Sequence, residues 1–318
     1  MDYFLITIGF CALIGGADLL IRGSAAIAFR LGISEMAVGL TIVAFGTSMP
    51  ELVVSASASL QNHPDLAITN VLGSNIVNVL GILGVAALIR SLPVSNATVL
   101  SEIPFSLAAV LLVGFLANAA LFPDHPALAI TRSDGVILLF FFVLFMAYVY
   151  MIAKTQTASD EDHLAHGIGL PRAWTFVVLG LVGLFIGGKL VVDSAVAIAL
   201  AAGISETMIG LTIVSVGTSL PELFASAVAA YRGRTDMAVG NVIGSNIFNL
   251  LWILGACALI TELPFNVISN IDLAVVVFAT AFVLVAVALG RKARIQRVHG
   301  LLFLVAYAAY LAYVIDRG

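Results

Sequence analysis

The chain has 318 residues, of which 61% are hydrophobic and only 10% are charged, whereas about 25% of the residues of an ordinary soluble domain are charged. This composition excludes a soluble globular protein, and the net charge of −4 argues against nucleic acid as a partner. Apolar stretches of about 20 residues, long enough to cross a bilayer, follow one another through nearly the whole sequence. We therefore expect an all-α polytopic membrane protein.

Ten membrane-spanning helices are expected, with no room for a soluble domain. In chain order they cover residues 3–29, 36–60, 66–89, 98–120, 133–153, 173–200, 207–231, 237–260, 270–289 and 297–315. The first carries Asp18 and Arg22 and lacks a basic leader, which predicts a retained helix and not a signal peptide. Basic residues concentrate in the loops that are cytoplasmic if the N-terminus lies outside. This predicts a multi-pass protein of the inner (plasma) membrane with both termini extracytoplasmic.

The second and third predicted spans are repeated as the seventh and eighth, at a shift of about 171 residues. The first copy begins at Gly32 with GISEMAVGLTIVAFGTSMPELVVSA, and the second begins at Gly203 with GISETMIGLTIVSVGTSLPELFASA. Each copy holds five spans, an odd number, so the copies would enter the membrane from opposite sides as inverted repeats. The predicted units are a first repeat over 1–153, a cytoplasmic connecting loop over 154–171 and a second, inverted repeat over 172–318.

The second and seventh spans contain GTSMPE (46–51) and GTSLPE (217–222). Their prolines lack an amide hydrogen, so backbone oxygens one turn earlier lose their helical partners. Glu51 and Glu222 place carboxylates where an unpaired charge costs several kcal/mol. No basic residue of these motifs balances them, which leaves bound cations or protons. The candidate ligands in these motifs are the carboxylates of Glu51 and Glu222 and the hydroxyls of Thr47, Ser48, Thr218 and Ser219.

The third and eighth spans contain GSNIVN (73–78) and GSNIFN (244–249). Ser74 and Asn78 are four residues apart, as are Ser245 and Asn249, so each pair would project from one face of a helix. Oxygen ligands without nearby histidine or cysteine favour Ca²⁺, Na⁺ or Mg²⁺ over zinc or copper, and Mg²⁺ gives up water reluctantly. The alternative is that these side chains only join helices. It stays open above all for Asn70, Asn75, Asn241 and Asn246.

Two further pairs of opposite charge lie four residues apart in the first and sixth spans. They are Asp18 with Arg22 and Lys189 with Asp193, at matched places in the two repeats and with the signs reversed. Charged residues at this spacing are neighbours on a helix surface. We expect intrahelical ion pairs near the helix ends.

The duplicated GTSxPE and GSNxxN blocks resemble the two alpha repeats of the cation/calcium antiporter superfamily, the sodium/calcium exchangers, and especially their compact prokaryotic members. The resemblance covers both repeats and the ten-span layout. It implies a cluster of cation sites between the second, third, seventh and eighth helices, with the first and sixth as a sliding gate. It also implies, as further ligands, the backbone carbonyls of Ala44 and Ser215. One position departs from the pattern: Asn249 stands where characterised exchangers often have an aspartate, which leaves the stoichiometry and any K⁺ dependence open.

The function expected from these residues is Na⁺/Ca²⁺ antiport by alternating access and not enzymatic catalysis. Two alternatives remain: a proton-coupled calcium antiporter, since buried glutamates can exchange a cation for protons, and, less favoured, a passive cation channel. The expected partners are the transported Ca²⁺ and Na⁺, with K⁺ or H⁺ as further ions, and the lipid bilayer. No cofactor, nucleic acid or obligate protein partner is expected.

Overall fold

The computed structural model describes residues 2–61, 63–119, 128–155, 167–203, 215–288 and 293–317. The first half contains α1 (Asp2–Leu31), α2 (Glu35–Val38), the π-helical turn η1 (Gly39–Val43), α3 (Ala44–Thr47), α4 (Met49–Leu60), α5 (Pro64–Ile76), the π-helical turn η2 (Val77–Ile82), α6 (Leu83–Ile89), β1 (Leu92–Pro93), α7 (Asn96–Leu100), α8 (Glu102–Asn118), β2 (Ala129–Ile130) and α9 (Arg132–Thr155). The second half contains α11 (Leu170–Ala201), α13 (Ser215–Thr218), α14 (Leu220–Tyr231), α15 (Thr235–Ile247), the π-helical turn η4 (Phe248–Ile253), α16 (Leu254–Ile260), β3 (Leu263–Pro264), α17 (Ser269–Ala288), β4 (Arg294–Ile295) and α18 (Arg297–Arg317).

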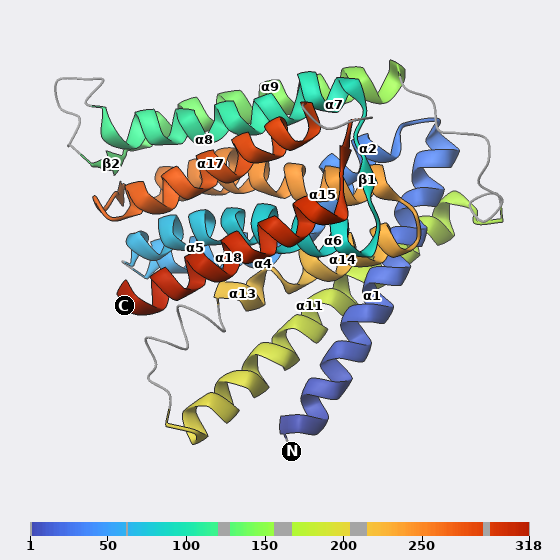
Figure 1. The fold of residues 1–318 in the computed structure, drawn as a ribbon, viewed down its shortest axis with the longest axis horizontal. Coiled ribbons are helices and arrows are strands. Elements are labelled where there is room, and N and C mark those ends of the chain that lie inside the picture. Colours follow the sequence, from blue (N-terminus) through green and yellow to red (C-terminus); the bar gives the residue numbers. More distant parts are fainter. Residues whose placement is uncertain are drawn as a thin grey trace.

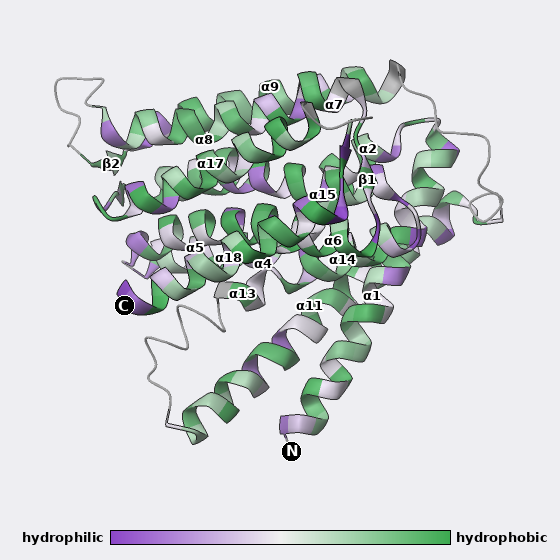
Figure 2. Cartoon of the chain, viewed as in Figure 1, coloured by the Kyte–Doolittle hydropathy of each residue, from purple (hydrophilic) through white to green (hydrophobic). Residues whose placement is uncertain are grey.

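The prediction of an all-helical membrane protein is confirmed. Among the described residues, eight helices are long and apolar enough to cross a membrane, and a ninth is formed if the bent pair 35–47 and 49–60 counts as one span. Figure 2 shows apolar residues along α8, α9 and α17, as expected of helices that face lipid. The predicted seventh span, 207–231, is described only from residue 215 onward, because its first part lies outside the described ranges.

The two proline motifs end one helix and begin another. The helices on either side of Ser48 are bent by 46°, and Pro50 lies in the first turn of α4. The second repeat has the same arrangement, with Ser219 before α14 and Pro221 in its first turn. Proline is tolerated there because its missing amide would have no helical partner. Both glutamates consequently occupy the first turn of a helix, where the helix dipole favours negative charge.

The spacing of the polar residues predicts regular α-helices for the third and eighth spans. The structure differs from this prediction. Each widens into a π-helical turn, η2 and η4, and these turns contain Asn78 and Asn249 at matched places. A π-helical turn inserts an extra residue into the hydrogen-bond ladder, is rare, and is often found at functional sites. Side-chain periodicity does not reveal it, because the apolar pattern continues through the inserted residue.

Helices α1 and α11 lie side by side and project obliquely from the other helices (Figure 1). Their backbones approach closely at glycines of both helices. A β-carbon on Gly16 would lie 2.7 Å from the amide nitrogen of Leu184, and one on Gly180 would lie 2.5 Å from that of Leu20. Small residues of this kind allow membrane helices to pack backbone to backbone. The pair has the positions that the resemblance assigns to the gate.

The two halves of the chain are joined by short antiparallel strand pairs. Strand β1 pairs with β4 through Leu92 and Ile295, and β2 pairs with β3 through Ile130 and Leu263. Each pair joins a loop of the first half to a loop of the second. The two loops joined by each strand pair therefore lie on the same side of the helices, although they are distant in sequence.

Two spans form the centre of the molecule. The apolar stretches of α5–α6 and α15–α16 are 78% buried, whereas those of α9 and α18 are 17% buried. Helices α4 and α14 pack against these central spans. The four spans that carry the GTSxPE and GSNxxN motifs consequently face one another in the interior, where most of their polar side chains are buried.

Candidate cation site

The two glutamates are reached by serines of the opposite repeat. Ser48 donates a hydrogen bond from Oγ to Oε1 of Glu222 (3.0 Å), and Ser219 donates one from Oγ to Oε1 of Glu51 (3.2 Å). Both glutamate side chains are completely buried. Because each serine immediately precedes the proline-initiated helix of its own repeat, the two motifs cross at one place. The prediction that Glu51 and Glu222 lie together agrees with this geometry.

Ser74 lies at the centre of this crossing. Its Oγ is 3.3 Å from Oε1 of Glu51 and 3.1 Å from Oγ of Ser219, and it accepts a hydrogen bond from Nδ2 of Asn249 (3.1 Å). One hydroxyl thus connects residues of both repeats. Ser245, its counterpart, is also completely buried, and its Oγ has no hydrogen-bond partner.

The asparagines of the two GSNxxN motifs pair across the repeats. Nδ2 of Asn78 donates to Oδ1 of Asn246 (3.0 Å), and Nδ2 of Asn249 donates to Oδ1 of Asn75 (3.2 Å). These bonds orient the amide groups of Asn78 and Asn249, whose Oδ1 atoms are left without a partner. Asn75 and Asn246 therefore hold the candidate ligands in place, which agrees with the helix-joining interpretation for these two residues.

Several buried oxygens of these motifs lack a hydrogen-bond donor. Among the described residues, they are Oε2 of Glu51, Oε2 of Glu222, Oδ1 of Asn78, Oδ1 of Asn249 and Oγ of Ser245. A buried polar atom without a partner costs about 1–3 kcal/mol, and more when it is charged. Within the described ranges no basic side chain forms an ion pair with either glutamate, and no group of three or more His, Cys, Asp or Glu residues occurs. Such a set of oxygens is suited to hard cations.

The threonines of the two motifs differ in their surroundings. Thr47 is buried, and its Oγ1 lies 3.2 Å from Oδ1 of Asn241 and 3.4 Å from the carbonyl oxygen of Ala44. That carbonyl also accepts the amide hydrogen of Ser48 (3.0 Å). Thr218 is only half-buried and lines a cavity. Ser215 begins α13, directly after residues outside the described ranges, so its carbonyl stays a predicted ligand.

Two serines that the sequence analysis missed support the glutamate-bearing helices. Nδ2 of Asn70 donates to Oγ of Ser55 (2.9 Å), and Nδ2 of Asn241 donates to Oγ of Ser226 (2.9 Å). The same amide nitrogens approach the backbone oxygens of Glu51 and Glu222, at 3.4 Å in each case. Asn70 and Asn241 therefore bind neighbouring helices through their amide nitrogens. The sequence contains a signal for these serines, since in each repeat the serine lies four residues after the glutamate.

The predicted intrahelical ion pairs are confirmed, but their expected location is wrong. Nζ of Lys189 lies 2.9 Å from Oδ2 of Asp193, and Nη1 of Arg22 lies 3.5 Å from Oδ2 of Asp18. Both pairs lie well inside α1 and α11 and not near the helix ends. Asp18 also forms an ion pair with Arg232, which follows α14. This second partner could not be read from helical spacing because it is distant in sequence.

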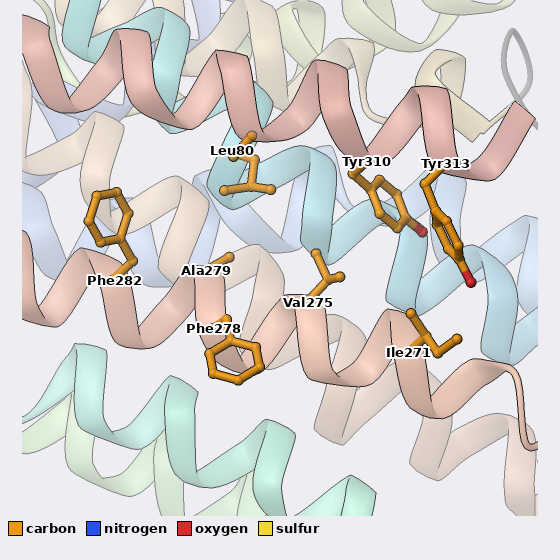
Figure 3. Close-up of a pocket in the computed structure, with 9 residues that line it drawn as sticks. Leu80, Ile271, Val275, Phe278, Ala279, Phe282, Tyr310 and Tyr313 are labelled. Atoms are coloured by element: carbon orange, nitrogen blue, oxygen red, sulfur yellow. The ribbon is translucent and has the colours of Figure 1, made fainter. Parts of the chain in front are cut away.

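A cavity of about 450 Å³ between α17 and α18 has a different character from the glutamate site. Leu80, Val275, Phe278 and Phe282 line it, and the hydroxyls of Tyr310 and Tyr313 lie toward one end (Figure 3). The described residues of its lining include no carboxylate and no amide side chain. It offers no ligand set for a cation.

Comparison with known proteins identifies the family. Residues 1–151 and 172–315 match the model of the sodium/calcium exchanger protein family. CaxA of Alkalimonas amylolytica is 39% identical over 313 residues, covering 96% of each chain. The sodium/calcium exchanger MaX1 of Methanosarcina acetivorans is 31% identical and covers 98% of this chain and 97% of its own.

A solved structure agrees in fold. That of the sodium–calcium exchanger NCX_Mj, soaked with Na⁺ and Ca²⁺, superposes with a TM-score of 0.81 at 32% identity. The match covers 98% of this chain and 97% of that one. With the family model matching nearly the whole length, the chain belongs to the sodium/calcium exchanger protein family.

Proposed function

We propose that this protein exchanges Na⁺ for Ca²⁺ across a membrane through the site between Glu51 and Glu222. The observation that carries this assignment is the set of buried oxygens without donors, contributed by both glutamates, Asn78, Asn249 and Ser245. Two carboxylates match one Ca²⁺ in charge, and several Na⁺ ions can occupy the same oxygens. The hydroxyls of Thr47, Ser48, Ser74, Thr218 and Ser219 and the carbonyls of Ala44 and Ser215 complete the proposed ligand set.

Ten spans in two inverted repeats are the proposed topology, and the strand pairs support it. Paired strands must lie on the same side of the membrane, so an even number of crossings separates β1 from β4 and β2 from β3. Between β2 and β3 the chain passes through α9, α11, the segment ending in α14, and α15–α16. The count is even only if the segment ending in α14 crosses. This agrees with repeats over 1–153 and 172–318, a loop over 154–171 and two termini on the same side of the membrane. That this side is extracytoplasmic is proposed from the distribution of basic residues among the loops.

Coupled exchange follows from the cost of the empty site. Without a cation, Glu51 and Glu222 leave charge uncompensated on two completely buried side chains. Reorientation of the empty site is therefore unfavourable, whereas occupation by Ca²⁺ or by Na⁺ removes the penalty and lets the site turn to the other side. A channel, by contrast, would require no counter-ion.

Proton coupling is the alternative, because the same two carboxylates could be neutralised by protons. The test is Ca²⁺ uptake into proteoliposomes loaded with Na⁺, at equal pH on both sides. We expect uptake that requires internal Na⁺ and stops when choline replaces it. Uptake that ignores internal Na⁺ but follows an imposed pH gradient would refute Na⁺ coupling in favour of H⁺, and Ca²⁺ flux without any counter-ion would indicate a channel.

A further inference from the structure

A cavity of about 230 Å³ lies beside the glutamate site. Helices α4, α11, α13 and α14 form its walls. Its lining includes Pro50 and Pro221, which directly precede Glu51 and Glu222 in sequence, and Thr218, a candidate ligand that is half-buried there. The cavity therefore reaches the first turns of the two helices that carry the carboxylates.

The only charged side chains among the described residues of its lining are Lys189 and Asp193. They form an ion pair at 2.9 Å, with side chains that are 66% and 60% exposed. A lipid-facing charge inside a spanning helix is costly, and such residues usually face water-filled cavities. Apart from Thr218, the other described lining residues are apolar, so the exposed ion pair is the feature that favours water over lipid in this cavity.

The matching place in the other repeat is arranged differently. Asp18 and Arg22 are the counterparts of Lys189 and Asp193, and Asp18 is tied to Arg232 beyond α14. Helix α1 also packs against α14. In the first repeat the charged pair is therefore tied to a neighbouring helix, whereas in the second repeat both of its members line the cavity.

We propose that Asp193 attracts cations into this cavity and that Lys189 limits its strength, so that the pair sets the relative access of Ca²⁺ and Na⁺ to the site. The energy of an ion in a potential is proportional to its charge. A unit charge in water changes the concentration of a monovalent cation about 10 Å away by roughly twofold, and that of a divalent cation by roughly fourfold. A change of net charge at this pair therefore changes the local Ca²⁺ concentration by the square of the factor by which it changes the local Na⁺ concentration.

This inference rests on the proposed exchange function, and the experiment separates the two. Three variants are compared with the wild type in vesicles whose cavity side faces the added ions: Lys189→Gln, Asp193→Asn and the double variant. The apparent KM for Ca²⁺ comes from Na⁺-driven uptake, and that for Na⁺ comes from Na⁺-driven release. Both are measured at low ionic strength and again in high choline chloride.

We expect Lys189→Gln to lower the KM for Ca²⁺ about fourfold and that for Na⁺ about twofold. Asp193→Asn should raise both by the same factors, and the double variant, which restores neutrality, should resemble the wild type. High salt should abolish the shifts because it screens charges across water. If Lys189→Gln does not fold, Asp193→Asn and the double variant still test the sign.

Unchanged KM values in the single variants, shifts in the same direction, or shifts of equal size for Na⁺ and Ca²⁺ would overturn the inference while wild-type exchange persists. Absence of Na⁺-driven Ca²⁺ uptake by the wild type would instead refute the proposed function.

Discussion

Replacing either buried glutamate by glutamine is the sharpest test of the cation site. In Glu51→Gln, the retained Oε1 can still accept the hydrogen bonds that Ser74 and Ser219 donate at 3.3 and 3.2 Å. The atom that changes is Oε2, which has no partner in the structure. In the proposed site, an amide nitrogen there would carry hydrogens toward the bound cation, and one of the two charges proposed to balance Ca²⁺ would be lost.

The expected loss is large. Removing one partner of a buried ion pair costs about 3–5 kcal/mol, which corresponds to roughly 10²- to 10⁴-fold weaker Ca²⁺ binding. Exchange should be abolished at ordinary Ca²⁺ concentrations in both Glu51→Gln and Glu222→Gln. The fold should persist, because the bonds to Oε1 remain and the ion-free protein no longer carries as much uncompensated charge.

Two measurements separate loss of binding from loss of folding. Ca²⁺ at about one hundred times its Kd stabilises a folded protein by about 2.7 kcal/mol, so the wild type should show a higher Tm in Ca²⁺ and the variants should not. Na⁺-driven Ca²⁺ uptake is measured on the same preparations. Glu102→Gln is the matched control: Glu102 is also buried, its Oε1 accepts a hydrogen bond from Tyr148 (2.7 Å) and its Oε2 has no partner.

We expect Glu102→Gln to keep both the Ca²⁺-dependent Tm and transport, because Glu102 lies on α8, outside the four spans that form the site. Wild-type transport in either Glu51→Gln or Glu222→Gln would remove that residue from the site. Equal losses in all three variants would mean that any buried carboxylate is needed for folding, and that the cation reasoning is wrong.

Other substitutions test the remaining parts of the site and the helix pair beside it. Ser219→Ala removes the hydroxyl that donates to Glu51 and should weaken Ca²⁺ binding roughly ten- to hundredfold, while Ser219→Thr should restore most of it. Asn249→Asp adds a negative charge to the site and should tighten Ca²⁺ binding about tenfold. It also replaces the Nδ2 donor to Ser74 and Asn75, so the Tm without cations should fall, and unchanged titrations would exclude Asn249 as a ligand. Gly16→Ala should lower the free energy of unfolding by about 1–3 kcal/mol, since its β-carbon meets the backbone of α11 at 2.7 Å. Gly15→Ala, with open space around it, should be neutral or stabilising, and equal Tm values for the two glycine variants would contradict the close packing.

Most of the helical architecture could be predicted from the sequence, because hydrophobicity over about 20 residues is a strong and local signal. The breaks at Pro50 and Pro221 were also predictable, since proline acts on its own backbone. The widened turns η2 and η4 were not, because an extra residue in a helical turn leaves the apolar pattern unchanged.

The glutamates, serines and asparagines of the candidate site were predicted from the sequence alone, because polar residues repeated in two apolar segments require an explanation in membrane energetics. Their partners were not. Residues far apart in the chain meet in the hydrogen bonds from serine to the glutamate of the opposite repeat and in the Asn78–Asn246 and Asn249–Asn75 bonds. The same is true of the cavity beside Lys189. The sequence by itself determined which groups are too polar for lipid, since that cost belongs to each residue. Only the tertiary structure decided which oxygens are satisfied by the protein and which remain for a cation, because hydrogen bonding depends on distances between helices that no local pattern specifies.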